Sequence, residues 1–195
     1  MWIFGYGSLV WRPGFEFEER VHGYVKGYSR RFWQASPDHR GTPEQPGRTV
    51  TLVCDPNAMV WGMAYRIAEE RVPEVSAYLD HREKAGYEAV EVLFHPDPSE
   101  KREPFRLLVY VALPSPDNEH WLGGEEDEET IAARVVACRG PSGSNIEYVV
   151  RLAEAQRQLN PDLVDEHLFR IERRVLHLCR QNGVQDPVLQ ELQLL

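Results

Sequence analysis

Residues 21–33 read VHGYVKGYSRRFW, a run rich in β-branched and aromatic side chains. Such residues favour extended backbone, so the run predicts a β-strand. Gly23 and Gly27 lie inside it, at positions where glycines mark bulges. Another strand is expected upstream at residues 1–4, a short apolar run that ends in Gly-Tyr-Gly-Ser. The N-terminal part of the chain therefore predicts a sheet.

More strands are expected through the first two-thirds of the chain. They cover residues 49–54, 59–67, 87–94 and 105–113. The first two flank DPNA at 55–58, where proline at the second turn position predicts a β-hairpin. A segment rich in proline and acidic residues, 114–128, is expected to be an irregular connection.

Helices are expected later in the chain. They cover residues 73–84, 129–138 and 144–159, and a last one from 160 to the glycine at 183. Ser144 and Glu147 form a capping box, and Asn160-Pro161 is a typical helix start. The apolar stripe of the last helix comprises Val164, Leu168, Ile171, Val175 and Leu178. Strands first and helices afterwards predict an α+β fold with a mostly antiparallel sheet or barrel.

The length of 195 residues corresponds to one domain. We place this domain at residues 1–180 and expect a loosely ordered tail at 181–195, where no clear period is visible. The three cysteines, Cys54, Cys138 and Cys179, form no C-x-x-C motif and no disulfide framework, which favours a reducing compartment such as the cytosol.

Composition also excludes several function classes. A net charge of −9 argues against a nucleic-acid partner, which usually requires a basic stripe. No run of about 20 apolar residues is present, so no membrane-spanning helix is expected. The seven histidines lack the spacing of metal ligands, so no metal site is expected.

Charge is unevenly distributed along the chain. Up to Arg48 there are seven cationic and five acidic residues, which is a net charge of +2. Because the whole chain carries −9, the residues after Arg48 carry −11. The acidic run EEDEE at 125–129 indicates a solvated loop or the first turn of a helix. The basic bias of the N-terminal part is either chance or a site for an anionic small molecule.

The sequence FGYGSL at residues 4–9 follows an apolar strand directly. Two glycines two positions apart allow the backbone to approach a ligand and to present N–H groups to an anion. Val10 stands where a dinucleotide-binding fingerprint has its third glycine, and Ser8 is not centred in G-x-S-x-G. The segment is thus an anion-binding loop or an ordinary tight turn.

Glu83 falls on the same helical face as Val72, Val75 and Leu79. A carboxylate that points inward has a raised pKa, which suits a general base near neutral pH. The alternative is that the helix has ended and Glu83 is solvated.

Tyr148 shares a helical face with Leu152, Ala155 and Leu159. A buried tyrosine needs a hydrogen-bond partner for its hydroxyl group. Tyr148 is therefore either a pocket residue or a core tyrosine bonded to a carbonyl.

Six motifs taken together resemble the ChaC family, which comprises glutathione-specific γ-glutamylcyclotransferases. The resemblance covers about residues 1–175, and its ordered motifs are FGYGSL (4–9), YSRRFWQ (28–34), DHRG (38–41), PGRTVTL (46–52), LDHREKAGY (79–87) and GPSGSNIEY (140–148). It implies the γ-glutamylcyclotransferase fold, a small mixed β-barrel with flanking helices. It also implies cleavage of glutathione to 5-oxo-L-proline and L-cysteinylglycine without a metal or other cofactor.

The resemblance also implies roles for particular residues. Glu83 corresponds to the catalytic carboxylate, and Tyr148 to a pocket tyrosine. Because glutathione carries two carboxylates and the N-terminal segment is basic, we also expect Arg30 or Arg31 to bind its glycine carboxylate; the alternative is that both are surface or structural arginines. The family's γ-glutamyl-binding loop corresponds to Ile3, Phe4, Gly5, Tyr6, Gly7 and Ser8. The main-chain N–H groups from Tyr6 to Leu9 are expected to hold the γ-glutamyl unit.

Two alternatives remain open from the sequence. One is a cyclotransferase for other γ-glutamyl peptides or amines. The other is a non-catalytic regulator that binds a protein partner through the acidic run or the C-terminal tail.

Overall fold

A computed structural model describes residues 1–82 and 86–194. The chain forms two compact units, each described by itself below. The first comprises Met1–Arg30 and Thr51–Glu119, and the second comprises Arg31–Val50 and His120–Leu195. Strands β2 and β3 both continue from one unit into the other.

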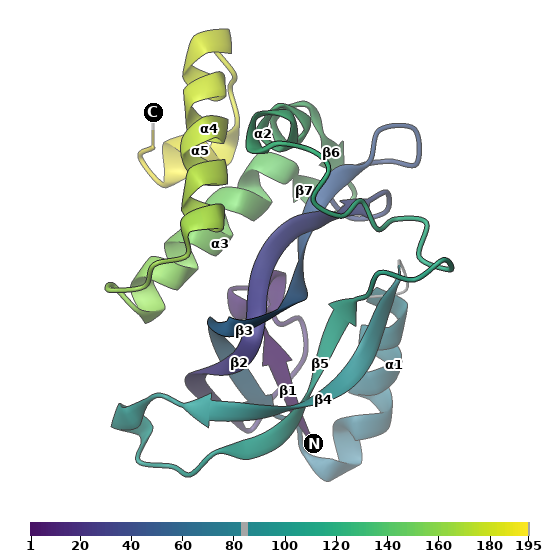
Figure 1. Cartoon of the computed structure of the whole chain (residues 1–195), viewed down its shortest axis with the longest axis vertical. Coiled ribbons are helices and arrows are strands. Elements are labelled where there is room, and N and C mark those ends of the chain that lie inside the picture. The colour runs from purple at the N-terminus through teal and green to yellow at the C-terminus, as the bar shows by residue number, and fades with distance from the viewer. Residues whose placement is uncertain (83–85, 195) are drawn as a thin grey trace. The chain divides into compact units, whose positions relative to one another are not determined.

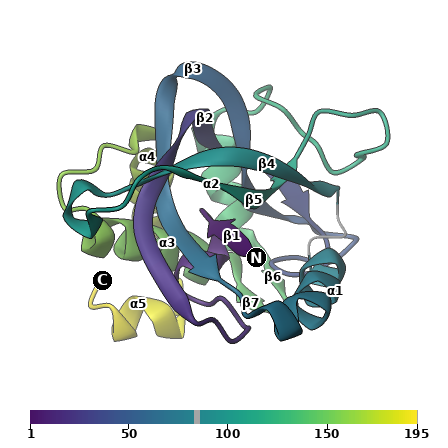
Figure 2. The same cartoon turned by 90° about the horizontal axis from the view of Figure 1, so that it is seen from below.

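A closed β-barrel with the strand order β1-β3-β2-β4-β5 forms the first unit (Figures 1 and 2). β1 pairs parallel with β5 and antiparallel with β3. The pairings of β2 with β4 and of β4 with β5 are antiparallel. The prediction of an α+β fold with a mostly antiparallel barrel is confirmed. The strands are β1 (Trp2–Gly5), β2 (Glu19–Ser36), β3 (Gly47–Arg66), β4 (Tyr87–Pro96) and β5 (Phe105–Ala112).

Aromatic side chains fill the core of the barrel. Phe4 and Phe94 are both buried, and their ring centroids lie 5.6 Å apart. Phe105 continues the cluster at 5.3 Å from Phe94. Ile3 and Phe4 are successive residues and both are buried, so both faces of β1 are covered. This burial explains why the first strand appears in the sequence as a continuous apolar run.

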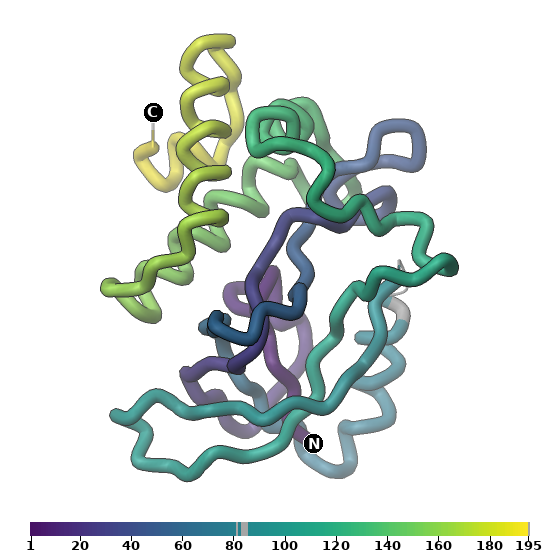
Figure 3. The backbone as a smooth tube through the Cα atoms, in the orientation of Figure 1, coloured from purple at the N-terminus to yellow at the C-terminus, as the bar shows by residue number. Residues whose placement is uncertain are grey.

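The hairpin predicted at residues 55–58 is wrong, because β3 runs without interruption from Gly47 to Arg66. Asp55 Oδ2 accepts a hydrogen bond of 2.6 Å from Ser29 Oγ on β2, which keeps this part of β3 beside its neighbour. Pro56 lies outside the segment that pairs with β1, so its missing N–H is tolerated there. The long β2 and β3 and the β4–β5 hairpin are visible in the backbone trace (Figure 3).

Helix α1 (Val72–Arg82) also belongs to the first unit, after the short 3-10 helix η2 (Glu69–Arg71). Val75 and Leu79 are buried, which confirms its predicted apolar face. Glu83, the next residue along the chain, lies outside the described residues. Two other 3-10 turns, η1 (Ser8–Val10) and η3 (Pro98–Glu100), connect the strands.

The second unit contains the other helices and a two-stranded sheet. α2 packs against α3 and α4, and α5 packs against α3. The buried side chains of this unit include Ile131, Val149, Leu152, Leu168 and Ile171. The elements are α2 (Glu128–Ala137), β6 (Arg139–Gly140), β7 (Gly143–Ser144), α3 (Asn145–Leu159), α4 (Glu166–Asn182) and α5 (Pro187–Glu191).

The predicted start of the last helix is wrong by about one and a half turns, because Asp165 and not Asn160 precedes its first turn. Asn160 ends α3, and Asp165 caps α4 by accepting a hydrogen bond of 3.1 Å from the N–H of Leu168. Val164 is 77% exposed and does not join the apolar stripe. An aspartate side chain directly before the buried stripe satisfies the first N–H groups of the helix, and this cap prevails over Asn160-Pro161.

The end of α4 lies where the sequence predicts it, whereas the residues after it contain a helix that the sequence did not predict. Gly183 ends the helix at a φ of +60°, as predicted. Where the sequence predicts a loosely ordered tail, the structure has α5, and Val188 and Leu189 are buried. In the described part of the chain, no helix has the length and apolar character needed to cross a membrane.

Candidate functional site

Strand β1 leads directly into a tight turn, here called the N-terminal turn (residues 5–10). The N–H of Val10 donates to Gly7 O at 3.0 Å, and those of Trp11 and Arg12 donate to Ser8 O at 3.3 and 2.8 Å. These three N–H groups are occupied inside the turn. The predicted anion-binding N–H groups are therefore the earlier ones, at positions 6 to 9.

Two glycines allow the N-terminal turn to pack closely on the barrel. A Cβ on Gly5 would lie 2.7 Å from the Cβ of Leu9. A Cβ on Gly62 of β3 would lie only 2.2 Å from the carbonyl oxygen of Gly5. Both distances are shorter than any normal contact, so these positions require glycine.

Two tyrosine hydroxyls join the turn to the barrel. Tyr6 donates its hydroxyl proton to Tyr110 O at 2.7 Å, and Tyr65 donates to Leu9 O at 2.7 Å. Burial raises the pKa of Tyr65 to about 12, so this hydroxyl remains a donor over the physiological pH range.

Arg30 is only 2% exposed and supports the same turn. Its Nε donates to Tyr6 O at 2.9 Å, and its Nη2 donates to Trp61 O at 2.7 Å. This guanidinium thus fixes main-chain carbonyls of β3 and of the turn. Its predicted contact with a glycine carboxylate remains a prediction.

Arg82, the last residue of α1, contacts the turn through its side chain. Its Nη2 donates to Ser8 Oγ at 2.5 Å, and its Nη1 donates to Pro13 O at 3.2 Å and to the Tyr78 hydroxyl at 3.0 Å. The sequence analysis did not identify Arg82. The available signal was its place beside Glu83 inside the motif LDHREKAGY.

Glu83 lies outside the described residues, and its catalytic role stays a prediction. On its C-terminal side, Gly86 has a φ of +86°, and a Cβ there would lie 2.2 Å from Asn118 Oδ1. Asn118 Nδ2 donates to Gly86 O at 3.2 Å and to Leu113 O at 3.0 Å. The chain is therefore held by hydrogen bonds at Arg82 and again at Gly86.

Tyr148 belongs to the second unit, where it is buried on α3. Its hydroxyl accepts a hydrogen bond of 3.2 Å from the N–H of Val50. The guanidinium carbon of Arg40 lies over its ring, 5.5 Å from the centroid. The prediction that this hydroxyl has a partner is confirmed, and its role toward a ligand stays a prediction.

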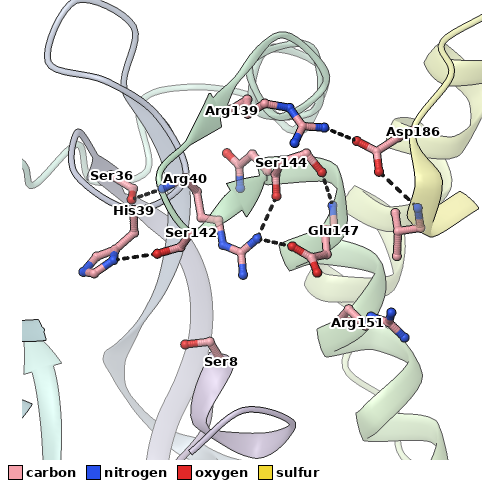
Figure 4. Close-up of polar contacts among 12 residues, drawn as sticks. Ser8, Ser36, His39, Arg40, Arg139, Ser142, Ser144, Glu147, Arg151 and Asp186 are labelled. Atoms are coloured by element: carbon pink, nitrogen blue, oxygen red, sulfur yellow. Dashed lines mark hydrogen bonds and ion pairs between the residues drawn. The ribbon is translucent and has the colours of Figure 1, made fainter. Parts of the chain in front are cut away.

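Arg40 links the motif DHRG to the motif GPSGSNIEY. Its Nη1 donates to Ser144 O at 3.0 Å and to Glu147 Oε2 at 2.6 Å (Figure 4). His39 Nδ1 lies 3.1 Å from Ser142 Oγ in the same network (Figure 4). The side chain of Ser144 accepts from the N–H of Glu147 at 3.0 Å, which confirms the predicted cap of α3.

Asn145 connects a third motif, PGRTVTL, to this cluster. Its Oδ1 accepts from the N–H of Arg48 at 2.6 Å, and its Nδ2 donates to Arg48 O at 2.8 Å. Two neighbouring motifs, DHRG and PGRTVTL, therefore meet a third, GPSGSNIEY, within the second unit, although the third lies about 100 residues further along the chain.

Arg31 lines an open pocket of about 420 Å³ in the second unit, together with Trp33, His167, Arg174 and residues 126–129. Asp127 caps α2 and Glu128 lies in its first turn, so the acidic run is the helix start that the sequence predicted as one alternative. Glu128 also accepts hydrogen bonds from Arg170.

Across residues 1–82 and 86–194, no three His, Cys, Asp or Glu side chains are grouped so that they could hold a metal ion. Around the N-terminal turn, the polar groups described above are hydroxyls, guanidinium groups and main-chain groups. Donors of this kind can bind an anionic group directly.

Curated proteins with similar sequences carry closely related names. "Glutathione-specific gamma-glutamylcyclotransferase 1" of Homo sapiens is 46% identical over 173 residues, which cover 88% of this chain and 76% of that protein. The protein of the same name from Danio rerio is 44% identical and covers 92% of this chain and 91% of its own length. "Glutathione-specific gamma-glutamylcyclotransferase" of Schizosaccharomyces pombe is 35% identical over 90% of this chain and 92% of its own length.

Solved structures and family models agree with these relatives. The crystal structure of a yeast γ-glutamyl cyclotransferase specific to glutathione has a TM-score of 0.81 and 30% identity, covering 90% of this chain and 95% of that one. The model described as "ChaC-like protein" matches residues 1–178. With its barrel, its N-terminal turn and these matches over most of its length, the chain belongs to the ChaC-like family.

Proposed function

We propose that this chain is a glutathione-specific γ-glutamylcyclotransferase, which converts reduced glutathione to 5-oxo-L-proline and L-cysteinylglycine. The observation that carries the proposal is the shared name of relatives that are up to 46% identical and match most of the chain. The N-terminal turn supports it, because Arg30 and Tyr65 donate to its main-chain carbonyls and the Tyr6 hydroxyl anchors it on Tyr110 O. A rigid turn suits a reaction that depends on the shape in which a flexible substrate is bound.

The reaction is an intramolecular acyl transfer. The α-amine nitrogen of the γ-glutamyl unit attacks the carbonyl carbon of its own side chain, and a C–N bond closes the five-membered lactam. The amide bond to cysteine breaks, and its nitrogen leaves as the amine of cysteinylglycine. No nucleophile from the protein is needed, because the attacking group is tethered to its target.

Glu83 is the residue to which we assign the proton transfers. An α-amine has a pKa of about 8 and is mostly protonated at neutral pH, so a base must remove its proton before attack. The same carboxyl group then delivers a proton to the leaving amine, which balances the reaction without any other acid.

The N-terminal turn has a different task in the proposed reaction. The N–H groups of residues 6–9 hold the α-carboxylate of the substrate or the developing oxyanion, and each such donor is typically worth about 3 kcal/mol. The buried side chains of Tyr6 and Leu9 form apolar walls that keep water from competing as the nucleophile.

Glutathione carries two carboxylates, which agrees with the cationic bias of the N-terminal segment. Arg30 or Arg31 is our candidate for binding the glycine carboxylate, and Arg30 also donates Nε and Nη2 to main-chain carbonyls. We place the protein in the cytosol, where a protein with three cysteines and a substrate in its reduced form are both favoured.

The test is to incubate the purified protein separately with reduced glutathione, glutathione disulfide and γ-glutamyl-alanine, and to measure 5-oxoproline. Release from reduced glutathione alone is expected. Release from γ-glutamyl-alanine at a similar kcat/KM would instead establish a broader cyclotransferase, and release from none of the three would favour the regulator.

The role of Glu83 is tested by Glu83→Gln, which keeps the shape of the side chain and removes the base. We expect kcat to fall by at least about 100-fold, the contribution of a positioned general base. A kcat near that of the wild type would rule out Glu83 as the base. Arg106→Gln is the control, because the Arg106 side chain is 70% exposed and forms an ion pair with the exposed Glu91.

A further inference from the structure

The last turn of α1 is joined to the N-terminal turn by a single guanidinium group. Arg82 Nη2 donates to Ser8 Oγ at 2.5 Å, while Nη1 donates to Pro13 O at 3.2 Å and to the Tyr78 hydroxyl at 3.0 Å. A guanidinium is planar and presents its donors in a fixed fork, so these contacts set the direction of the side chain. Arg82 thereby contacts the loop that follows β1 at two points, Ser8 and Pro13.

A second connection joins the same two elements through β5. The carbonyl of Tyr110 accepts the hydroxyl proton of Tyr6 at 2.7 Å, and the hydroxyl of Tyr110 donates to Asp80 Oδ1 at 2.8 Å. Asp80 lies two residues before Arg82 on α1. The end of α1 and the N-terminal turn are thus tied at two points, both within the first unit.

The contact with Arg82 also determines what the Ser8 hydroxyl can do. A hydroxyl has one proton and two lone pairs. Because Ser8 Oγ accepts from a guanidinium, its own proton is left to donate, and a hydroxyl that accepts from a cation is a stronger donor. Ser8 is therefore prepared to donate a hydrogen bond to an anionic group.

We infer that Arg82 is a positioning residue for the proposed reaction, acting through Ser8 and through the last turn of α1. It orients the Ser8 hydroxyl toward the anionic γ-glutamyl end of the substrate. It also holds, on the N-terminal turn, the end of the helix from which the chain continues to Glu83. This inference rests on the proposed function and assigns no direct substrate contact to Arg82.

The test is a double-mutant cycle on Ser8→Ala and Arg82→Gln with reduced glutathione as the substrate. Arg82→Gln is expected to lower kcat by about tenfold to 100-fold, because small misplacements of reacting groups are costly, while KM changes by less than about threefold. In the Arg82→Gln background, Ser8→Ala is expected to cost clearly less than in the wild type, because both changes remove the same hydrogen bond.

Further variants separate positioning from stability. Tyr110→Phe removes only the hydroxyl that binds Asp80 and keeps the carbonyl that binds Tyr6, so it is expected to fold normally and to lower kcat several-fold. Arg82→Lys keeps one charged donor and is expected to recover part of the kcat that Arg82→Gln loses. Arg106→Gln removes an exposed arginine of the same unit and serves as the matched control for kcat and Tm.

The inference is overturned if Arg82→Gln and Tyr110→Phe keep the wild-type kcat while only Tm falls. It is also overturned if the effects of Ser8→Ala and Arg82→Gln on kcat are additive, since Arg82 would then not act through Ser8. Wild-type turnover is measured in the same assay. Failure of the proposed function would appear as an inactive wild type, whereas failure of this inference appears as active variants beside an active wild type.

Discussion

At the scale of single residues, the N-terminal turn depends on glycines, because a side chain at these positions would fill the space that the turn occupies. Gly62 on β3 leaves the space that the carbonyl of Gly5 occupies, with 2.2 Å between that oxygen and a would-be Cβ. The ring of Phe4 lies 2.8 Å from the same point. The position of the turn is therefore determined partly by a residue of a different strand, more than 50 positions away in the chain.

Gly62→Ala is expected to displace the N-terminal turn and to lower both stability and activity. Overpacking of this kind costs about 1–3 kcal/mol of unfolding free energy, and we expect kcat/KM for glutathione to fall at least about tenfold. Chemical denaturation and steady-state kinetics measure the two effects.

The matched control for this prediction is Gly27→Ala. Gly27 has a φ of +82° and no atom within 4 Å of a would-be Cβ, so the change strains the backbone without moving the turn. It is expected to lower stability by about 1–2 kcal/mol and to leave kcat/KM unchanged. Equal losses of kcat/KM in both variants would show that activity falls because stability falls, and not because the turn is displaced.

At the scale of elements, periodicity and caps predicted most of the structure correctly. The strand at 1–4, the apolar face of α1 and the cap of α3 all rest on local patterns, and all are present. The errors at residues 55–58 and 160 have different causes, a contact with a neighbouring strand in the first case and a competing local cap in the second. DPNA has the composition of a turn, yet Ser29 on the neighbouring strand binds Asp55 and β3 continues. Asn160-Pro161 has the composition of a helix start, yet Asp165 caps the helix instead.

Helix α4 carries a buried histidine that makes the stability of the second unit depend on pH. His167 Nε2 accepts a hydrogen bond of 3.2 Å from the N–H of Phe32, and Nδ1 lies 3.4 Å from Glu128. Burial, and secondarily the charge of Arg31, lower the pKa of His167 below its usual value, although Glu128 and Asp165 oppose this shift. The native state therefore holds His167 in its neutral form.

The free energy of unfolding is expected to fall as the pH drops below about 6.5, the pKa of a histidine in the unfolded chain. The sign follows from the protons that each state binds. Below about pH 6.5 the unfolded state binds a proton on His167, whereas the native state binds it only at a lower pH, so protonation favours unfolding. Above about pH 6.5 both states hold a neutral His167, and its titration no longer lowers stability. Denaturation at a series of pH values measures it.

His167→Gln is the comparison for this dependence, because its side-chain oxygen still accepts from Phe32 and does not titrate. The slope of stability against pH between about 5 and 6.5 is expected to be smaller in the variant than in the wild type. Identical slopes would show that His167 does not titrate differently in the folded and unfolded states.

At the scale of the whole molecule, the sequence contained the fold class and the motifs but not the way they combine. The order of strands and helices predicted the α+β barrel, because hydrophobic periodicity is a local property. The meeting of DHRG, PGRTVTL and GPSGSNIEY through Arg40 and Asn145 could not be predicted, because it depends on tertiary hydrogen bonds. The contact of Arg82 with Ser8 was invisible for the same reason.

Several charged residues of the acidic run have structural roles. The acidic run at 125–129 accounts for five of the negative charges, and its members also serve local purposes, since Asp127 caps α2 and Glu126 pairs with Arg48. Net charge alone therefore says little about the substrate. The uneven distribution, with a net charge of +2 up to Arg48 and −11 after it, is the informative part.

The central claim is that the chain cyclises the γ-glutamyl unit of glutathione. The most direct measurement is the product balance of a complete reaction of the purified full chain with reduced glutathione. We predict one 5-oxoproline and one cysteinylglycine for each glutathione consumed, and no free glutamate, because the substrate's own amine displaces the leaving group. Free glutamate in place of 5-oxoproline, or no consumption of glutathione, would rule out the proposed cyclisation.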